Sequence, residues 1–234
     1  MQLDPATHTY LLENERYTSV TTLVHLCFQA FDADAILKKM KITPTSKYYG
    51  MTKEEIKQLW QKNAEDAQQQ GTRMHSIIER YYKNEQITEE EKQLPEIIYF
   101  MEFTKTFQLT PFGIELCICS KTIHLAGTID FVAQNEDGTV DIYDWKRANH
   151  IELQNPYNKY SPVVTHIPDT NFWHYTLQLN LYKYLLETEY KKKVNKMYLV
   201  SFHPANMSYF KYEVSNIQTY IPQFLEKLTL KHTP

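Results

Sequence analysis

Two short stretches determine the expected fold: residues 127–133 read GTIDFVA, and residues 142–148 read IYDWKRA. Each places a carboxylate, Asp130 or Asp144, inside an otherwise apolar run of strand-forming residues. Between them, residues 135–138 read NEDG, a turn sequence typical of a β-hairpin. We therefore expect two antiparallel strands that bring their acidic groups close together.

The second of these strands predicts a reactive face. Val140, Ile142, Asp144 and Lys146 lie on one side of it, because side chains alternate along a strand with a period of two. A carboxylate is costly to bury unless a cation or hydrogen bonds meet it. Two carboxylates beside one ammonium group are what metal-dependent phosphodiester cleavage needs, because the acids hold a divalent cation and the ammonium stands beside the phosphate.

Composition bounds the class of protein. A chain of 234 residues with 42% hydrophobic and 23% charged residues is typical of one soluble globular domain. Three cysteines cannot form a disulfide framework, which favours a reducing compartment. We see no signal peptide and no apolar run of the ~20 residues that a membrane span needs, so we expect an intracellular protein without membrane contact. The net charge of −3 argues against a generally basic nucleic-acid binder but allows a local basic groove.

The rest of the chain predicts helices around a strand-rich centre. We expect a hairpin over 8–20, helices over 19–28 and 32–40, a loop over 42–52, and one or two helices from Lys53 to residue 84 that begin with a Thr52/Glu55 capping box. Next we expect a helix over 94–107 and strands over 112–120, 124–134 and 139–148. A long functional loop over 151–169 leads to a helix over 171–190. The chain then continues with strands over 196–204 and 208–214 and a closing helix over 217–230. This order predicts an α/β fold with a central mixed sheet flanked by helices.

Two helical segments carry further polar residues at regular spacing. Gly71, His75 and Glu79 are spaced by four, so they share one helix face, and the glycine leaves room for a ligand or another backbone beside the imidazole. Gln178 and Tyr182 are also spaced by four. Taken alone, His75 is more typical of a partly buried core histidine, and the second pair of a half-buried helix with a polar edge.

Together, four segments resemble a known family. GTRMH (71–75), GTID (127–130), DWK (144–146) and QLNLY (178–182) occur in the order typical of the RecB-type branch of the PD-(D/E)XK nuclease superfamily. That branch includes the RecB nuclease domain, CRISPR-associated exonucleases and the mitochondrial genome maintenance exonuclease. Residues 17–24, YTSVTTLV, are similar to the opening of several phage and mitochondrial members. The resemblance implies a restriction-endonuclease-like core with an N-terminal helical elaboration.

The resemblance also implies roles for individual residues. It assigns His75, Asp130, Asp144 and the backbone carbonyl of Trp145 to a Mg²⁺ or Mn²⁺ ion, and Lys146 to the phosphate or the attacking water. It makes Gln178 and Tyr182 both supports of the site and DNA contacts, and it makes Glu79 and Glu115 supporting residues. We add Arg147 and Trp173 as expected DNA contacts, since both lie beside these motifs.

Other cofactors are not expected. Several members of the branch hold an iron–sulfur cluster with four cysteines, whereas the three cysteines here end at Cys119. A zinc site at Cys117, Cys119 and His124 lacks a fourth ligand, and cysteines two apart in a strand are more typical of small apolar side chains on one sheet face. The chain has no Walker A motif, so any unwinding needs a helicase or polymerase partner.

These observations predict a metal-dependent DNA exonuclease that prefers single-stranded ends and serves repair, replication or recombination. Residues 1–52 are expected to form a cap or arch and residues 53–234 the nuclease core, within one compact domain. The alternatives are a structure-selective DNA or RNA endonuclease of the same fold, such as the viral cap-snatching type, and an inactive nuclease fold that binds DNA.

Overall fold

The strands form one mixed sheet. The computed structural model describes residues 2–4 and 9–229, and within them eight strands follow the order β1-β2-β3-β5-β6-β7-β8, with β4 paired to β5. Their bounds are Gln2–Asp4 (β1), Thr9–Leu12 (β2), Glu15–Ser19 (β3), Pro111–Ser120 (β4), Leu125–Gln134 (β5), Val140–Lys146 (β6), Val194–Ser201 (β7) and Phe210–Glu213 (β8). The predicted α/β class with a central mixed sheet is confirmed, because β5–β6 pair antiparallel and β6–β7 pair parallel.

The N-terminal hairpin extends this same sheet. Strands β2 and β3 turn at Glu13 and Asn14, whose φ angles of 53° and 68° are those of a tight hairpin turn. Strand β3 then pairs in parallel with the start of β5, Thr18 opposite Leu125. The predicted boundary after residue 52 falls at Thr52, the N-cap of α3, and does not separate two sheets. His8, the first residue of the predicted hairpin, lies outside the described residues.

The described part of the chain also forms seven α-helices. They are Val20–His25 (α1), Ala33–Lys39 (α2), Lys53–Tyr82 (α3), Glu89–Lys92 (α4), Pro95–Thr106 (α5), Asn171–Thr188 (α6) and Ile221–Thr229 (α7). Helix α3 is one continuous helix of 30 residues, and it begins with the predicted Thr52/Glu55 capping box. Leu230, the last residue of the predicted closing helix, is not described. Across the described helices, none combines the length and apolarity that crossing a bilayer requires.

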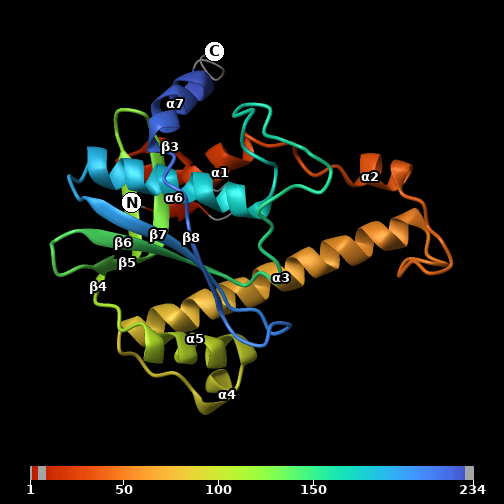
Figure 1. Ribbon diagram of the computed structural model, residues 1–234, viewed down its shortest axis with the longest axis horizontal. Coiled ribbons are helices and arrows are strands. Elements are labelled where there is room, and N and C mark those ends of the chain that lie inside the picture. Colours follow the sequence, from red (N-terminus) through yellow and green to blue (C-terminus); the bar gives the residue numbers. More distant parts are fainter. Residues whose placement is uncertain (1, 5–8, 230–234) are drawn as a thin grey trace.

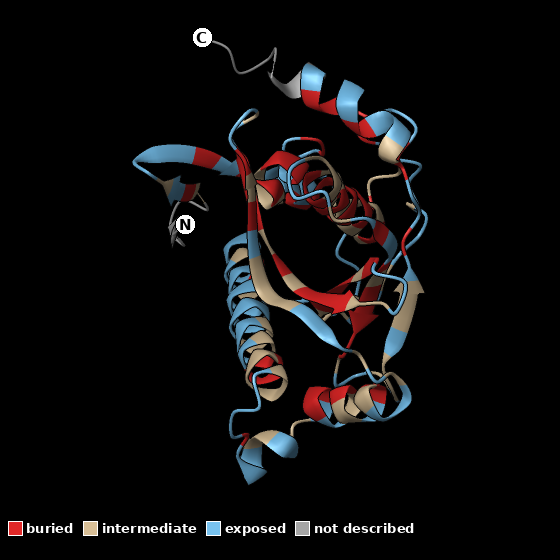
Figure 2. Ribbon diagram, turned by 90° about the vertical axis from the view of Figure 1, so that its left-hand side faces the viewer, coloured by how far each residue is buried: buried red, intermediate tan, exposed pale blue. Residues whose placement is uncertain are grey.

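Two apolar cores lie on the two faces of the sheet. The first packs α1, α6 and α7 against one face, and the second packs α3 and α5 against the other, as Figure 1 shows. Strand β6 contributes to both, because Ile142 belongs to the first core and Tyr143 and Trp145 to the second. In Figure 2 the buried residues accordingly gather on the sheet and on the helix faces turned toward it.

Helix α3 also carries an extension away from the sheet. Its C-terminal part is anchored in the second core by Met74, Ile77 and Ile78, whereas residues 61–69 are all exposed. At its far end it meets α2, and the buried side chains there are Leu37 and Ile56. Figure 1 shows α3 running out from the sheet toward α2. We call residues 29–62, which form this extension, the arm.

Candidate active site

The acidic residues meet where β5 and β6 separate. Pairing between the two strands ends at Phe131 opposite Tyr143. Asp130 and Asp144 are the next residues on each strand, so they face each other just beyond the last pair. The backbone N–H of Trp145 donates a hydrogen bond of 2.8 Å to Asp130 Oδ2 and so fixes the orientation of that carboxylate.

A third carboxylate comes from β4. Ile114 pairs with Phe131 and Leu116 with Ile129, so Glu115 stands beside Asp130 without a paired partner. Glu115 has a φ of 46°, in the left-handed region that a residue with a side chain rarely adopts. Such strain is typical of functional sites. The predicted supporting residue therefore lies within the acidic cluster itself.

His75 on α3 completes this cluster. Its Nδ1 lies 3.7 Å from Asp130 Oδ2 and 3.9 Å from Glu115 Oε1. Among the described residues, possible ligand atoms of His75, Glu115 and Asp130 all lie within 4.8 Å of one another. This grouping differs from the predicted trio, because Glu115 takes the place expected for Asp144.

Asp144 and Lys146 form the second half of the site. Lys146 Nζ lies 2.6 Å from Asp144 Oδ2, so the two groups form a close, buried ion pair. Burial raises the pKa of Asp144 to about 6, with repulsion from Asp130 adding to it and the Lys146 ammonium opposing it. Because Asp144 is paired with a single ammonium group, its carboxylate can also coordinate a divalent cation.

The electrostatics of His75 also indicate a cation-binding environment. Burial acts to lower the pKa of His75, but the charge of Asp130 and the contact with Glu115 outweigh it and raise the pKa to about 9. For Lys146, burial likewise lowers the pKa, but the charges of Asp144 and Asp130 raise it above its ordinary range. Carboxylate oxygens with one imidazole are a ligand set that suits Mg²⁺ or Mn²⁺, so the residues present fit the predicted metal.

Helix α6 carries the predicted supporting residues Gln178 and Tyr182, which contact each other and the strand that bears Asp130. The Gln178 amide donates a 2.9 Å hydrogen bond to the Tyr182 hydroxyl. The Tyr182 ring is buried against Gly127, where an added Cβ would lie only 2.6 Å from ring atom Cε1. The glycine of GTID is therefore required by the tyrosine of QLNLY, and the two motifs pack on each other.

A hollow of about 410 Å³ opens beside the cluster. Its lining residues are Gly71, Thr72, His75, Ser76, Glu79 and Glu115. A Cβ at Gly71 would meet no atom within 4 Å, so this glycine borders open space rather than another backbone. Glu79 lies in the same hollow but pairs with Lys83 at 2.6 Å.

Two predicted DNA contacts have other partners in the structure. Arg147 Nε lies 3.2 Å from buried Glu96, and Trp173 Nε1 donates to the carbonyl of Leu153 at 3.0 Å. Trp145 contacts the cluster through its backbone N–H, which donates to Asp130. The DNA contacts of Arg147 and Trp173 and the ligand role of the Trp145 carbonyl stay predictions.

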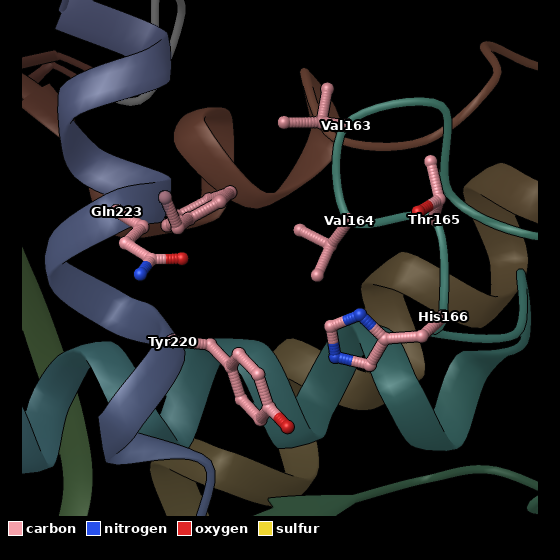
Figure 3. Close-up of a pocket in the computed structure, with 7 residues that line it drawn as sticks. Val163, Val164, Thr165, His166, Tyr220 and Gln223 are labelled. Carbon is pink, nitrogen blue, oxygen red and sulfur yellow. The ribbon is translucent and has the colours of Figure 1, made fainter.

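A second hollow, of about 200 Å³, lies between the loop at residues 163–166 and α7 (Figure 3). His166 and Tyr220 stand at one side of it, with ring centroids 4.6 Å apart. None of its lining residues carries a carboxylate, so it lacks the ligands that the first hollow offers.

Comparison with known proteins identifies the family. The sequence profile of the PD-(D/E)XK nuclease superfamily matches residues 12–229. The chain belongs to the PD-(D/E)XK nuclease superfamily. Its mixed α/β sheet, with Asp130 and Asp144 on separating strands, is accordingly a PD-(D/E)XK fold.

Similarity to individual known proteins is low. A search of curated proteins finds no match. Among solved structures, a "putative exonuclease" from Eubacterium rectale is similar with a TM-score of 0.41 and 12% identity over 70% of this chain and 69% of the other. The protein SSO0001 is similar with a TM-score of 0.32 and 15% identity over 59% and 58%.

Proposed function

We propose that this chain is a divalent-metal-dependent DNA exonuclease that prefers single-stranded ends. One observation carries the proposal: His75, Glu115 and Asp130 converge beside Asp144, whose buried carboxylate is paired with the Lys146 ammonium at 2.6 Å. Membership of a nuclease superfamily supports a nucleic-acid substrate. Repair, replication or recombination is the setting we propose, with a helicase or polymerase as partner.

The metal ligands in this proposal are His75, Glu115, Asp130 and Asp144, with the Trp145 carbonyl as a further candidate. Mg²⁺ or Mn²⁺ held there lowers the pKa of water and offsets charge on the scissile phosphate. The Trp145 N–H keeps the Asp130 carboxylate oriented. The Lys146 ammonium is charged at neutral pH and stabilises the negative charge that develops on the phosphate, or orients the attacking water.

The arm supports a preference for unpaired strands. Phe31 and Tyr49 are 72% and 64% exposed, and Trp60 packs between Phe31 and Tyr48. Residues 29–62 contain seven lysines and four acidic residues, a net charge of +3 in a chain of net −3. Aromatic rings stack on unpaired bases and lysines meet phosphates, both with little regard for sequence.

A timed digestion of labelled DNA tests the proposal. Linear and circular single strands of one sequence, the matching duplex and the matching RNA are incubated with Mg²⁺, Mn²⁺ or EDTA. We expect rapid loss of the linear single strand only with metal, an intact circle, slower duplex digestion, and slower cleavage at higher salt when DNA is subsaturating.

The alternatives give different results in the same assay. Equal cleavage rates for the circular and the linear single strand would contradict the exonuclease assignment and favour an endonuclease with the same metal site. A preference for the RNA would favour the RNA endonuclease. Binding of DNA without cleavage under any metal condition would favour an inactive nuclease fold.

A further inference from the structure

The aromatic ring of Tyr175 lies against the ammonium group of Lys146. Tyr175 is on α6, three residues before Gln178, so the two side chains share one side of that helix. Lys146 Nζ is 4.7 Å from the centroid of the Tyr175 ring, well within the range of a cation–π contact. The ammonium therefore has two neighbours of opposite kind: the Asp144 carboxylate at 2.6 Å and the ring face.

These two neighbours hold the ammonium in different ways. A carboxylate accepts hydrogen bonds and competes with a substrate for the N–H groups of Lys146. A ring face attracts the positive charge through its quadrupole without occupying a particular N–H group. The contact also lies in a sheltered place, because the Lys146 side chain is only 19% exposed, and desolvation strengthens cation–π attraction.

The ring matters most once a cation is held by the carboxylates. Asp144 then shares its charge with that cation, so its pull on Lys146 weakens. Lys146 is a flexible side chain with many rotamers, and a second contact is needed to keep its ammonium in one place. Tyr175 offers this contact from α6, an element separate from β6, which carries both Asp144 and Lys146.

We propose that Tyr175 is a positioning residue that fixes the Lys146 ammonium through its ring and not through its hydroxyl. The consequence for cleavage rests on the function proposed above. Replacement of the ring by an aliphatic side chain leaves Lys146 charged but free to move, so the chemical step slows while DNA binding persists.

The first test compares Tyr175→Phe, which keeps the ring, with Tyr175→Leu, which removes it. Under single-turnover conditions with Mn²⁺, we expect Tyr175→Phe within about threefold of the wild-type rate and Tyr175→Leu at least tenfold slower, both with unchanged DNA affinity. In a Lys146→Ala background, Tyr175→Leu should add no further loss, because residues that act through one another are not additive. A full additional tenfold loss in that background would contradict positioning through Lys146.

The second test needs neither metal nor cleavage. In EDTA, the side-chain CH₂ signals of Lys146, identified by their disappearance in Lys146→Ala, should show an upfield ring-current shift in ¹H–¹³C spectra. We expect the shift to persist in Tyr175→Phe and to vanish in Tyr175→Leu. Lys211, whose Nζ lies 3.6 Å from the Tyr198 ring centroid, serves as an internal control that should not change.

The two tests separate the two proposals. If no variant cleaves DNA but the ring-current shift follows the ring at position 175, the proposed function fails and the positioning contact stands. If Lys146 shows no shift in the wild type, or keeps it in Tyr175→Leu, the positioning role is wrong whatever the nuclease activity.

Discussion

The pKa of His75 reports the negative charge of its neighbours Asp130 and Glu115. Because its pKa is raised to about 9, it is protonated at neutral pH without metal, and a bound cation must displace that proton. We expect the apparent affinity for Mn²⁺ to rise by roughly tenfold per pH unit from pH 7 until it levels off near the pKa of His75. His75→Gln should bind Mn²⁺ more weakly and lose this pH dependence in calorimetric titration.

The metal-free protein provides the control, because the pKa of His75 also determines how its folding stability changes with pH. Because the folded-state pKa of His75 lies above the ordinary 6.5, its protonation stabilises the fold fully below about pH 6.5. This stabilisation, at most about 3 kcal/mol, is lost as the pH rises through about 9. Asp144, raised to about 6, acts in the same direction at lower pH. Thermal unfolding in EDTA should therefore show falling stability from pH 6.5 to 9, with a flatter profile for His75→Gln. Identical slopes, together with equal Mn²⁺ affinities, would restore the interpretation of His75 as an ordinary core histidine.

Glu115 can be distinguished from an acidic bystander in the same hollow. We predict that Glu115→Gln weakens Mn²⁺ binding by at least about tenfold, since even the loss of a residue that only hydrogen-bonds to a metal ligand costs that much. The matched control is Glu79→Gln, since Glu79 lines the same hollow but pairs with Lys83. Calorimetric affinities that fall for Glu79→Gln and not for Glu115→Gln would reverse the assignment.

At the scale of elements, the two glycines of the motifs have opposite reasons to be glycine. A methyl group at Gly127 would lie 2.6 Å from the Tyr182 ring, whereas one at Gly71 would meet nothing within 4 Å. Gly127→Ala should therefore destabilise the fold by about 1–3 kcal/mol through overpacking. Gly71→Ala, in the interior of α3, should stabilise it by about 0.5–1 kcal/mol. Chemical denaturation measures the free energy of unfolding of both variants. A Gly127→Ala protein as stable as the wild type would refute the close packing of β5 on α6.

The sequence predicted most elements because their signals are local. Capping boxes, the 135–138 turn and alternating apolar residues place α3, β5 and β6 without knowledge of the rest of the fold. The same kind of signal, Thr88 with Glu91, marks the N-terminus of α4, which we did not predict. Strand β1 was also not predicted, because its three residues depend on pairing with β2.

The site was predictable in its residues and less so in its geometry. Motif spacing brought His75, Asp130, Asp144 and Lys146 together in the prediction, but nothing local shows that Glu115 takes a left-handed backbone conformation between two paired residues. That conformation lies where the antiparallel pairing of β4 with β5 is interrupted. The contact of Tyr175 with Lys146 likewise joins α6 to β6, and only the spacing to Gln178 could have indicated it.

For the whole molecule, the sheet explains why the active groups converge. Three neighbouring strands, β4, β5 and β6, each present one carboxylate at the level where β5 and β6 separate. Helix α3, which packs in the second core, places His75 beside these carboxylates. Helix α6, which packs in the first core, covers Lys146 with the Tyr175 ring. The arm continues α3 outward, so the same helix connects the cluster to the exposed aromatic and basic residues.

The most direct test of the central claim, that the Asp144–Lys146 pair and its neighbours form a phosphodiester-cleaving site, compares three variants of β6. Asp144→Asn and Lys146→Ala remove the two charges, while Asp141→Asn changes a carboxylate on the same strand that accepts hydrogen bonds from Asn135 and the Lys196 backbone, outside the site. With a labelled linear single strand and Mn²⁺, we predict that the first two lose at least about a hundredfold in cleavage rate, the scale of losing a central electrostatic group. The control should stay close to the wild type. Undiminished cleavage by Asp144→Asn or Lys146→Ala would contradict the assignment of this site.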